Sequence, residues 1–406
     1  MSAGGLSARR LRRLHDVMTA HIERGSVPGL VALISRRGEA HVEALGSKDT
    51  AGRESIARDT IFRISSLTKP VTAVAALILV ERCVLRLDDP VDRLLPELSG
   101  RRVLRRLDGP LDDTVAAERP ITVRDLLTFT MGFGLVMATP DAVPLLKAAL
   151  ELGVAVGPPA PAATPAPDEF MRGLGSLPLA YQPGERWLYS TGSDVLGVLI
   201  ARAAGVSFEQ FLHDEIFAPL GMADTAFSVS PAKLDRFGAC YGIAGATGAT
   251  VVFDPADGQW SRPPAFPSGA GGLVSTADDY LTFARMLLDR GRGGGGRTGE
   301  RILSRPAVEL MTSDRLTAAQ KVHGALGPGF FEAHSWGFGV AVDTRRDDLA
   351  GRPGRYGWDG GMGAAWRSDP AEEMITILMT PRAWESPAPP PLYRDFWTLA
   401  AQAIDD

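Results

Sequence analysis

The spacing of apolar residues near the N-terminus predicts an amphipathic helix over residues 7–24. Leu11, Leu14, Met18 and Ile22 recur every three or four positions and therefore share one helical face, while the nearby arginines lie off it. Such a helix can lie on a membrane surface or dock on a sheet. We expect it to dock on a sheet.

Strand-like patterns follow this helix and return near the other end of the chain. An apolar run over 27–34 and an alternating run over 41–45 flank a short polar turn, which predicts an antiparallel hairpin. Further strands are predicted at 336–342, 364–366 and 374–379, with helices at 277–288 and 392–404. We therefore expect one sheet domain of the α/β class, α+β type, built from both ends of the chain.

The middle of the chain has helical patterns instead. Helices are predicted at 71–80, 122–130, 194–204 and 208–217. Prolines concentrate within the connection 151–178, which is long for a compact domain. This connection is either a lid or rim over a site or a solvated loop.

Composition and charge exclude several classes of protein. The 406 residues are 45% hydrophobic and carry a net charge of -5, which is globular and gives no basic footprint for nucleic acid. Two cysteines are too few for a disulfide framework, and the six histidines lack metal-ligand spacing. No apolar leader or stretch of roughly 18 apolar residues is present. We expect a cytoplasmic protein without a membrane partner, a metal or a cofactor; the sequence makes no prediction of the oligomeric state.

Ser66 and Lys69 are the candidate nucleophile and base. Pro70 is tolerated only in the first turn of a helix, so it predicts a helix start near Ser66, and the apolar run 71–80 indicates that this helix is buried. Unpaired N–H groups and the positive dipole end at such a terminus favour an oxyanion. Lys69 lies one turn on from Ser66, on the same face.

The Ser-x-x-Lys spacing alone leaves an alternative open. A lysine acts as the base only if its pKa falls from about 10.4 toward 7, which requires burial. Ser66 can instead be a helix-capping serine with a surface lysine beside it. Ser230-x-x-Lys233 has the same spacing, but no long apolar helix follows it.

Two further motifs favour the catalytic interpretation. Tyr189-Ser190-Thr191 follows a turn at 183–187, and Trp358-Asp359-Gly360-Gly361 lies near the C-terminus. With Ser66-x-x-Lys69, this order resembles the serine hydrolases of the class C β-lactamase and penicillin-binding-protein superfamily. More narrowly, it resembles the β-lactamase-like carboxylesterases called family VIII. Segments 123–128, 269–273, 275–278 and 366–370 also fall in the expected order.

The resemblance implies a β-lactamase-like fold, in which an antiparallel sheet is flanked by helices and a mainly helical domain is inserted. Residues 1–65 plus 261–406 would form the α/β domain, and residues 66–260 would form the helical domain. The active site would lie at their interface.

The resemblance also implies catalytic roles. Ser66 would be acylated, and Lys69 and Tyr189 would share the general base and acid work. A phenol near pKa 10 becomes a useful base beside an ammonium, because the cation favours phenolate. The backbone N–H groups of Ser66 and Gly361 would form the oxyanion hole.

Four residues are expected to bind substrate: Trp358, Gly360, Thr191 and Phe129. Trp358 stands where relatives that recognise β-lactams carry lysine or histidine, so an apolar wall is expected there. Thr191 stands where relatives often carry asparagine. Phe129 replaces the histidine of Leu-Leu-Thr-His-Thr-Ser-Gly and is expected to make the rim of the site more apolar.

Four functions are compatible with these motifs. A serine carboxylesterase acting on small-molecule esters of short to medium acyl chains is the first, and an acyltransferase using the same acyl-enzyme is the second. A weak β-lactamase or D-alanyl-D-alanine peptidase is the third, and the lack of an export signal argues against it. A non-catalytic binding protein is the fourth, but it has no reason to keep Ser66, Lys69 and Tyr189 together.

Overall fold

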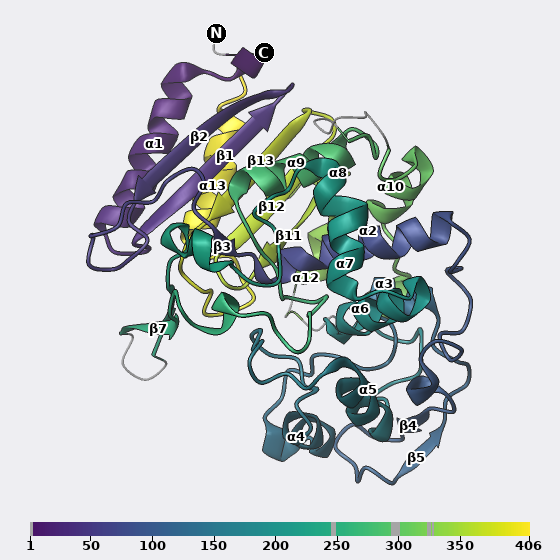
Figure 1. The fold of residues 1–406 in the computed structure, drawn as a ribbon. Coiled ribbons are helices and arrows are strands. Elements are labelled where there is room, and N and C mark those ends of the chain that lie inside the picture. The colour runs from purple at the N-terminus through teal and green to yellow at the C-terminus, as the bar shows by residue number, and fades with distance from the viewer. Residues whose placement is uncertain (1–2, 245–248, 294–300, 323–325, 327–328) are drawn as a thin grey trace.

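The protein is built around one seven-stranded antiparallel sheet. A computed structural model describes residues 3–244, 249–293, 301–322, 326 and 329–406. The strand order is β2-β1-β13-β12-β11-β10-β9 (Figure 1). The strands are β1 (Gly29–Arg36), β2 (Glu39–Gly46), β9 (His334–Trp336), β10 (Ala341–Asp343), β11 (Tyr356–Gly360), β12 (Ala364–Asp369) and β13 (Met374–Met379). The sheet therefore joins the two ends of the chain, as the strand patterns predict.

The predicted N-terminal hairpin is present and its turn has a local cause. Arg36 pairs with Glu39, and the two residues between them, Arg37 and Gly38, have φ of 50° and 85°. Positive φ at both positions is the geometry of a two-residue type I′ turn, which matches the twist of the strands. β1 is buried along its whole length between β2 and β13, whereas β2 is a largely exposed edge strand.

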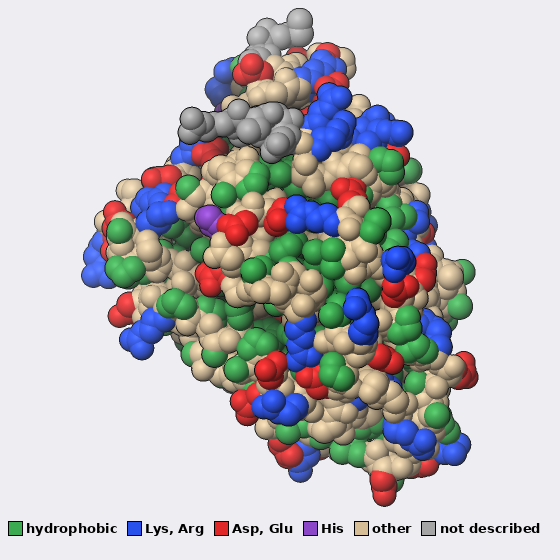
Figure 2. Space-filling model, turned by 45° about the vertical axis from the view of Figure 1, so that its right-hand side comes forward, with side chains coloured by type: hydrophobic (Ala, Val, Ile, Leu, Met, Phe, Trp, Pro, Cys, Tyr) green, Lys and Arg blue, Asp and Glu red, His purple; other side chains and the backbone are tan. Residues whose placement is uncertain are grey.

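Helices cover both faces of the sheet, and the outer surface is polar. Figure 2 shows acidic and basic side chains interspersed with hydrophobic ones over one face of the molecule. No helix in the described ranges is by itself long and apolar enough to cross a membrane.

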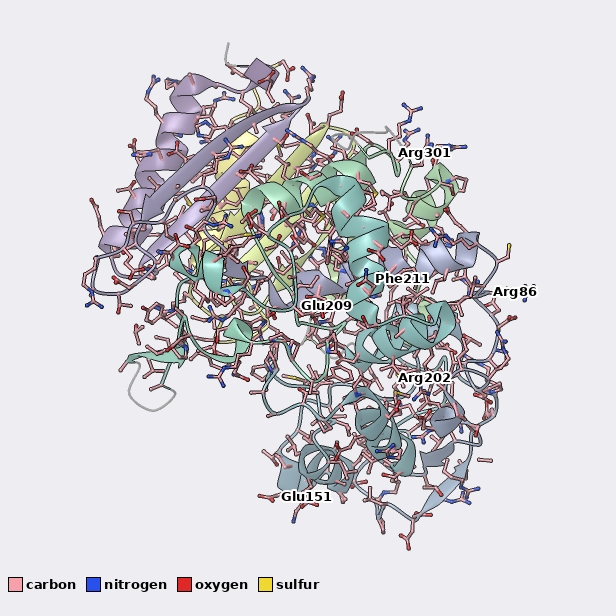
Figure 3. The ribbon with its side chains drawn as sticks, viewed as in Figure 1. Arg86, Glu151, Arg202, Glu209, Phe211 and Arg301 are labelled. Carbon is pink, nitrogen blue, oxygen red and sulfur yellow. The ribbon has the colours of Figure 1, made fainter. Side chains whose placement is uncertain are left out.

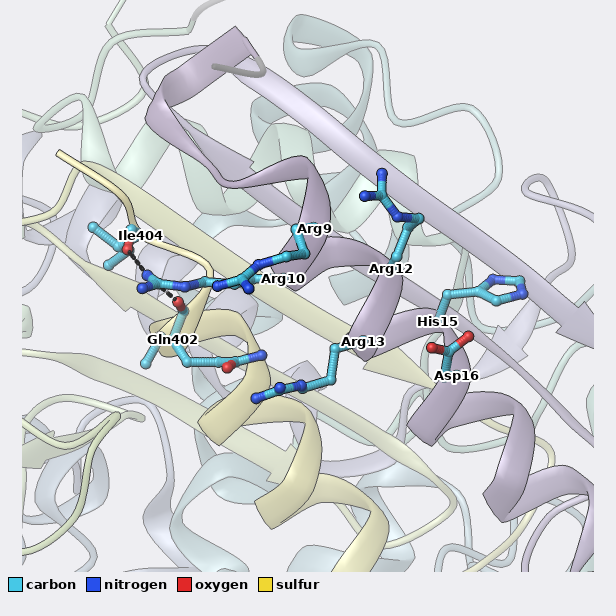
Figure 4. Close-up of a pocket in the computed structure, with 9 residues that line it drawn as sticks. Arg9, Arg10, Arg12, Arg13, His15, Asp16, Gln402 and Ile404 are labelled. Carbon is cyan, nitrogen blue, oxygen red and sulfur yellow. Dashed lines mark hydrogen bonds between the residues drawn. The ribbon is translucent and has the colours of Figure 1, made fainter.

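The first face is covered by α1 (Ala8–Glu23) and α13 (Pro391–Gln402). Leu11, Leu14 and Met18 of α1 are buried in one cluster with α13 and the sheet, which confirms that this helix docks on the sheet. The arginines that precede and interleave with these residues line a groove between the two helices (Figure 4). Arg10 alone among them is tied down, donating to the carbonyls of Gln402 (2.8 Å) and Ile404 (2.7 Å).

The opposite face packs against the helical part of the chain. α9 (Ala277–Leu288) lies against β12 and β13, and Tyr280 meets Trp366 edge to face. α2 (Thr68–Glu81) is buried over residues 68–79 and packs on α6 (Thr191–Ala204). Arg202 of α6 pairs with Glu97 and with Asp168 of α5, and so ties these segments together (Figure 3).

The remaining elements are short. The helices are α3 (Val123–Thr128), α4 (Pro144–Glu151), α5 (Pro167–Ser176), α7 (Phe208–Leu212), α8 (Ala218–Leu220), α10 (Arg305–Met311), α11 (Ala318–Lys321) and α12 (Phe330–Ala333). Three strand pairs lie outside the main sheet: β3 (Phe62–Arg63) with β8 (Val274–Ser275), β4 (Arg102–Leu104) with β5 (Thr114–Ala116), and β6 (Cys240–Ile243) with β7 (Thr250–Asp254).

One local prediction is wrong. The single strand expected over 336–342 is two strands, β9 and β10, because the chain reverses between them with Gly339 at a φ of 72°. The helix expected over 208–217 is confirmed, with a π-helical turn at His213–Phe217 between α7 and α8.

The β6–β7 hairpin lies beside the main sheet although its residues fall within 66–260. Tyr241 exchanges backbone hydrogen bonds with residues 381 and 383, just after β13. The proposed boundary at residue 261 therefore separates two segments that are in contact, and the two-domain division stays a prediction.

Candidate active site

Ser66 lies in a 3₁₀ turn, Ser65–Leu67, that leads into α2. The helix proper begins at Thr68, two residues later than predicted. Ser65 has a φ of 45°, a conformation that few non-glycine residues adopt and that often occurs at functional sites. No side-chain capping hydrogen bond is made at this terminus, so Ser66 is not a helix-capping serine. Its side chain is half-buried and remains accessible.

Lys69 is buried and contacts Ser66 directly. Its side chain lies 2.8 Å from Ser66 Oγ and donates to the carbonyl of Ala270 at 2.6 Å (both distances from Nζ). Only 2% of the residue is exposed. Burial penalises the ammonium and lowers the pKa of Lys69 to about 7, while the charge of Asp194 opposes this shift. The alternative of a surface lysine is therefore wrong.

Tyr189 lies on the other side of Ser66. Its hydroxyl is hydrogen-bonded to Ser66 and accepts a hydrogen bond from Trp358 Nε1 at 2.9 Å. The Nζ of Lys69 lies 4.4 Å from the centre of the Tyr189 ring. Burial raises the pKa of Tyr189 far above its usual value. The direction of this shift favours the protonated phenol and so a general-acid role for Tyr189, while its share in the general base work stays a prediction.

Gly360 and Gly361 bring β11 against the turn that carries Ser66. A Cβ on Gly360 would collide with the carbonyl oxygen of Ile64, so only glycine allows this approach. The space beside the Gly361 Cα is open, and its carbonyl accepts from Trp384 N at 2.8 Å. Among the described residues no backbone carbonyl accepts the Gly361 N–H. This N–H therefore has no backbone acceptor in the described structure, and its part in the oxyanion hole stays a prediction.

An aromatic cluster surrounds Tyr189. Trp358 lies 5.6 Å from the Tyr189 ring and 4.6 Å from Trp336, measured between ring centres. Further members are Phe129, Trp187, Phe330 and Phe331. The sequence predicts an apolar wall at Trp358 but not its hydrogen bond to Tyr189, because nothing in the chain pattern places the two residues together.

The expectation for Phe129 is wrong. Phe129 is 0% exposed and packs behind Tyr189, with ring centres 5.6 Å apart, so it does not form the rim of the site. It follows α3 with a φ of 59°, and this reversal turns its ring toward Trp336 in the cluster. Thr191 is also buried, and its hydroxyl has no hydrogen-bond partner within the part of the chain that the structure describes.

The competing Ser-x-x-Lys pair does not resemble this arrangement. Ser230 is exposed and precedes a short 3₁₀ segment. Lys233 is paired with Asp224 at 2.8 Å and donates to the carbonyl of Ala223 at 2.7 Å. Lys233 is therefore held away from its serine, whereas Lys69 is held against Ser66.

The proline-rich connection packs near the site. A Cβ on Gly271 would lie 2.7 Å from the ring of Pro159, so this proline covers the segment next to Ala270. Ala162 N donates to Gln259 Oε1 at 3.2 Å. The connection thus packs on residues 259–271, which favours the rim interpretation over a solvated loop.

A family model for beta-lactamase matches residues 14–393 of the sequence. The chain belongs to the beta-lactamase family. The family match, together with similarity to an esterase and to a hydrolase of known structure, shows that this chain is a serine hydrolase. The predicted superfamily and its β-lactamase-like fold class are confirmed, while the narrower assignment to family VIII stays a prediction.

Similar proteins include both hydrolases and acyl-transferring enzymes. Protein Rv1367c of Mycobacterium tuberculosis is 36% identical to this chain over 363 residues. The match covers 87% of this chain and 86% of Rv1367c. Esterase EstB of Burkholderia gladioli is 30% identical to this chain, and the match covers 93% of this chain and 92% of EstB. The solved structure of EstCE1, a hydrolase with promiscuous acyltransferase activity, superimposes with a TM-score of 0.76 at 25% identity and covers 98% of each chain.

Proposed function

We propose that the protein is a serine carboxylesterase of the family VIII type that hydrolyses small-molecule esters of short to medium acyl chains. The observation that carries this proposal is the contact of a buried lysine amine, 2.8 Å from Ser66 Oγ, at the start of α2. The similarity to Esterase EstB supports an ester substrate.

In the proposed acylation step, neutral Lys69 accepts the proton of Ser66 as its Oγ attacks the ester carbonyl. The pKa near 7 leaves a substantial fraction of Lys69 neutral at physiological pH, so the base is present before substrate binds. The N–H groups of Ser66 and Gly361 stabilise the tetrahedral oxyanion.

The leaving alkoxide then takes the proton of Tyr189. The resulting phenolate is stabilised by the Trp358 N–H and regains a proton from the Lys69 ammonium, so the Tyr189 proton leaves with the alcohol and the proton taken from Ser66 ends on Tyr189. Water attacks the acyl-enzyme in the second half-reaction with the same groups acting in reverse.

Labelling with a fluorophosphonate tests this assignment. We expect a single adduct, mapped by peptide mass spectrometry to Ser66, and no adduct after Ser66→Ala. The Ser66→Ala protein should remain folded because the hydroxyl makes no capping hydrogen bond. Label on Ser230, or undiminished ester turnover by Ser66→Ala, would overturn the proposal.

An acyltransferase is the second candidate, because EstCE1 has promiscuous acyltransferase activity and an acyl-enzyme can react with water or an alcohol. Product analysis with an added alcohol separates the two: a new ester indicates transfer, and free acid indicates hydrolysis. A weak β-lactamase or D-alanyl-D-alanine peptidase activity is a less favoured candidate, because the arginines beside β11 are engaged in ion pairs.

Two arginines near Trp358 could in principle bind a substrate carboxylate. Arg355 is held by Asp343 at 2.7 Å, and Arg367 is held by Asp359 at 2.7 and 2.8 Å. Arg367 also lies over the ring of Trp397 on the α13 side of the sheet. Neither arginine is free to bind a substrate carboxylate in place of the lysine or histidine that relatives carry at the position of Trp358. This supports neutral esters as substrates. A cytoplasmic location, without a membrane or nucleic-acid partner, is part of the same proposal.

A further inference from the structure

Asp194 is linked to Lys69 through the segment 268–270. It lies in the first turn of α6, and its Oδ1 accepts hydrogen bonds from Ser268 Oγ at 2.6 Å and from Ala270 N at 3.1 Å. The carbonyl of the same Ala270 accepts the hydrogen bond of Lys69 at 2.6 Å. Ser268 Oγ in turn accepts a hydrogen bond from Gly271 N at 3.1 Å, so Asp194 anchors the backbone on both sides of Ala270, directly at Ala270 N and through Ser268 at Gly271 N.

The Asp194 carboxylate has no cation in contact with it. No ion pair to this side chain occurs among the described residues, and the residue is half-buried. Asp194 and Lys69 are close enough for the charge of each to shift the pKa of the other. Burial raises the pKa of Asp194, and its hydrogen bonds with Ser268 and Ala270 oppose the rise. An ionisable group with a perturbed pKa beside a candidate base, and with specific hydrogen bonds to the segment that holds this base, is a candidate for a functional role.

We propose that Asp194 is a positioning residue for the proposed esterase reaction, which holds the Ala270 carbonyl against Lys69 and places a negative charge near that lysine. The inference rests on the proposed function of Ser66 and Lys69. Sequence reasoning missed Asp194 because its partners lie more than 70 residues away along the chain.

The geometry explains how a carbonyl directs the base. A neutral amine has two N–H groups and one lone pair. When one N–H of Lys69 is committed to the Ala270 carbonyl, rotation about the last side-chain bond is restricted, and the lone pair can be kept toward Ser66 Oγ. Without the two hydrogen bonds that Ser268 and Ala270 donate to Asp194, the Ala270 carbonyl loses the anchor that fixes its direction.

Two titratable side chains of the described residues face Lys69. Asp194 faces it from α6, and the phenol of Tyr189 faces it from the segment before α6. Asp359 of β11 acts on Tyr189 but is neutralised by Arg367. Loss of the Asp194 charge therefore removes the carboxylate that raises the pKa of Lys69.

The decisive variant is Asp194→Asn, because an asparagine Oδ1 can still accept from Ser268 and Ala270 while the charge is gone. We expect the acid limb of the kcat/KM profile for p-nitrophenyl butyrate to move to lower pH by roughly one unit. The plateau value should stay within about threefold of wild type. Asp194→Ala loses the anchor as well, and its kcat should fall at least about tenfold with little change in KM.

Asp279→Asn is the matched control. Asp279 is a largely buried aspartate in the first turn of α9, and it accepts from Asp224 N at 2.7 Å and Thr225 Oγ1 at 3.0 Å without contacting the site. Its variant should keep the wild-type pH profile. The inference is wrong if Asp194→Asn leaves the profile in place, or if Asp279→Asn moves it equally.

The two proposals can fail separately. Should Ser66→Ala keep its turnover, the proposed function itself fails. Should Ser66→Ala be inactive while Asp194→Asn has the wild-type profile, only the role of Asp194 fails. If Asp194→Ala does not fold, Asp194→Asn still decides, since it keeps both hydrogen bonds.

Discussion

The hydrogen bond from Trp358 to Tyr189 gives a quantitative test of the mechanism. Trp358→Phe removes the indole N–H that lies 2.9 Å from the phenol oxygen but keeps an aromatic ring in the cluster. In the proposed reaction Tyr189 becomes negative as it protonates the leaving group. The lost hydrogen bond is then one to a charged group.

The magnitude separates two cases. A hydrogen bond to a neutral phenol contributes about 0.5 to 1.5 kcal/mol, or roughly two- to twelvefold in rate. A hydrogen bond to a developing phenolate contributes about 1.5 to 3 kcal/mol, or roughly 12- to 160-fold. We expect a loss of kcat in the second range, with a smaller change in KM, since the interaction strengthens only in the transition state.

Trp336→Phe is the matched control for lost ring volume. Trp336 is 0% exposed, packs 4.6 Å from Trp358 between ring centres, and its Nε1 has no partner among the described residues. Steady-state hydrolysis of p-nitrophenyl butyrate and urea unfolding should be measured for both variants. Equal kcat values for the two variants would refute the idea that the N–H stabilises a developing charge.

Four further predictions follow from the same site. The kcat/KM for neutral esters should rise with pH and level off around an apparent pKa near 7, because deprotonation of Lys69 creates the base; a flat profile from pH 5 to 9 would contradict this. Lys69→Ala and Tyr189→Phe should each approach the activity of Ser66→Ala, with the double variant little worse than either, whereas multiplying losses would exclude a coupled unit. p-Nitrophenyl esters of short acids should be hydrolysed at least about a hundredfold more efficiently than a chromogenic cephalosporin, measured on one preparation, because no free cation awaits a carboxylate. Gly360→Ala should lower the free energy of unfolding in urea by about 1 to 3 kcal/mol, because its Cβ would collide with the Ile64 carbonyl; an unchanged midpoint would show that β11 can move away at no cost.

Local sequence signals predict elements well where one cause dominates. Thr276 accepts a hydrogen bond from Asp279 N at the start of α9, and this cap places the helix over residues 277–288 in both the prediction and the structure. The buried strand β13 is likewise found at its predicted residues, 374–379. The strand expected at 336–342 is wrong because apolar runs do not reveal a reversal at Gly339.

The candidate site could be predicted only as far as its motifs reach. Ser66, Lys69 and Tyr189 come together as the motif order implies, but the carbonyl of Ala270 and the carboxylate of Asp194 belong to no local pattern. Phe129 shows the opposite error. Its place in a site motif suggested a rim residue, while the left-handed turn after α3 buries its ring.

The pairing of β1 with β13 has a consequence for how the chain acquires its fold. Arg36 pairs with Met374, so β1 has only β2 as a neighbour in the sheet until the residues of β13 have been synthesised. A lone two-stranded hairpin is marginally stable, and its free apolar edge is a template for aggregation. Pairings of such high sequence separation also form slowly. The sheet is therefore completed only after β13 has emerged, and until then the β1–β2 hairpin is exposed to aggregation.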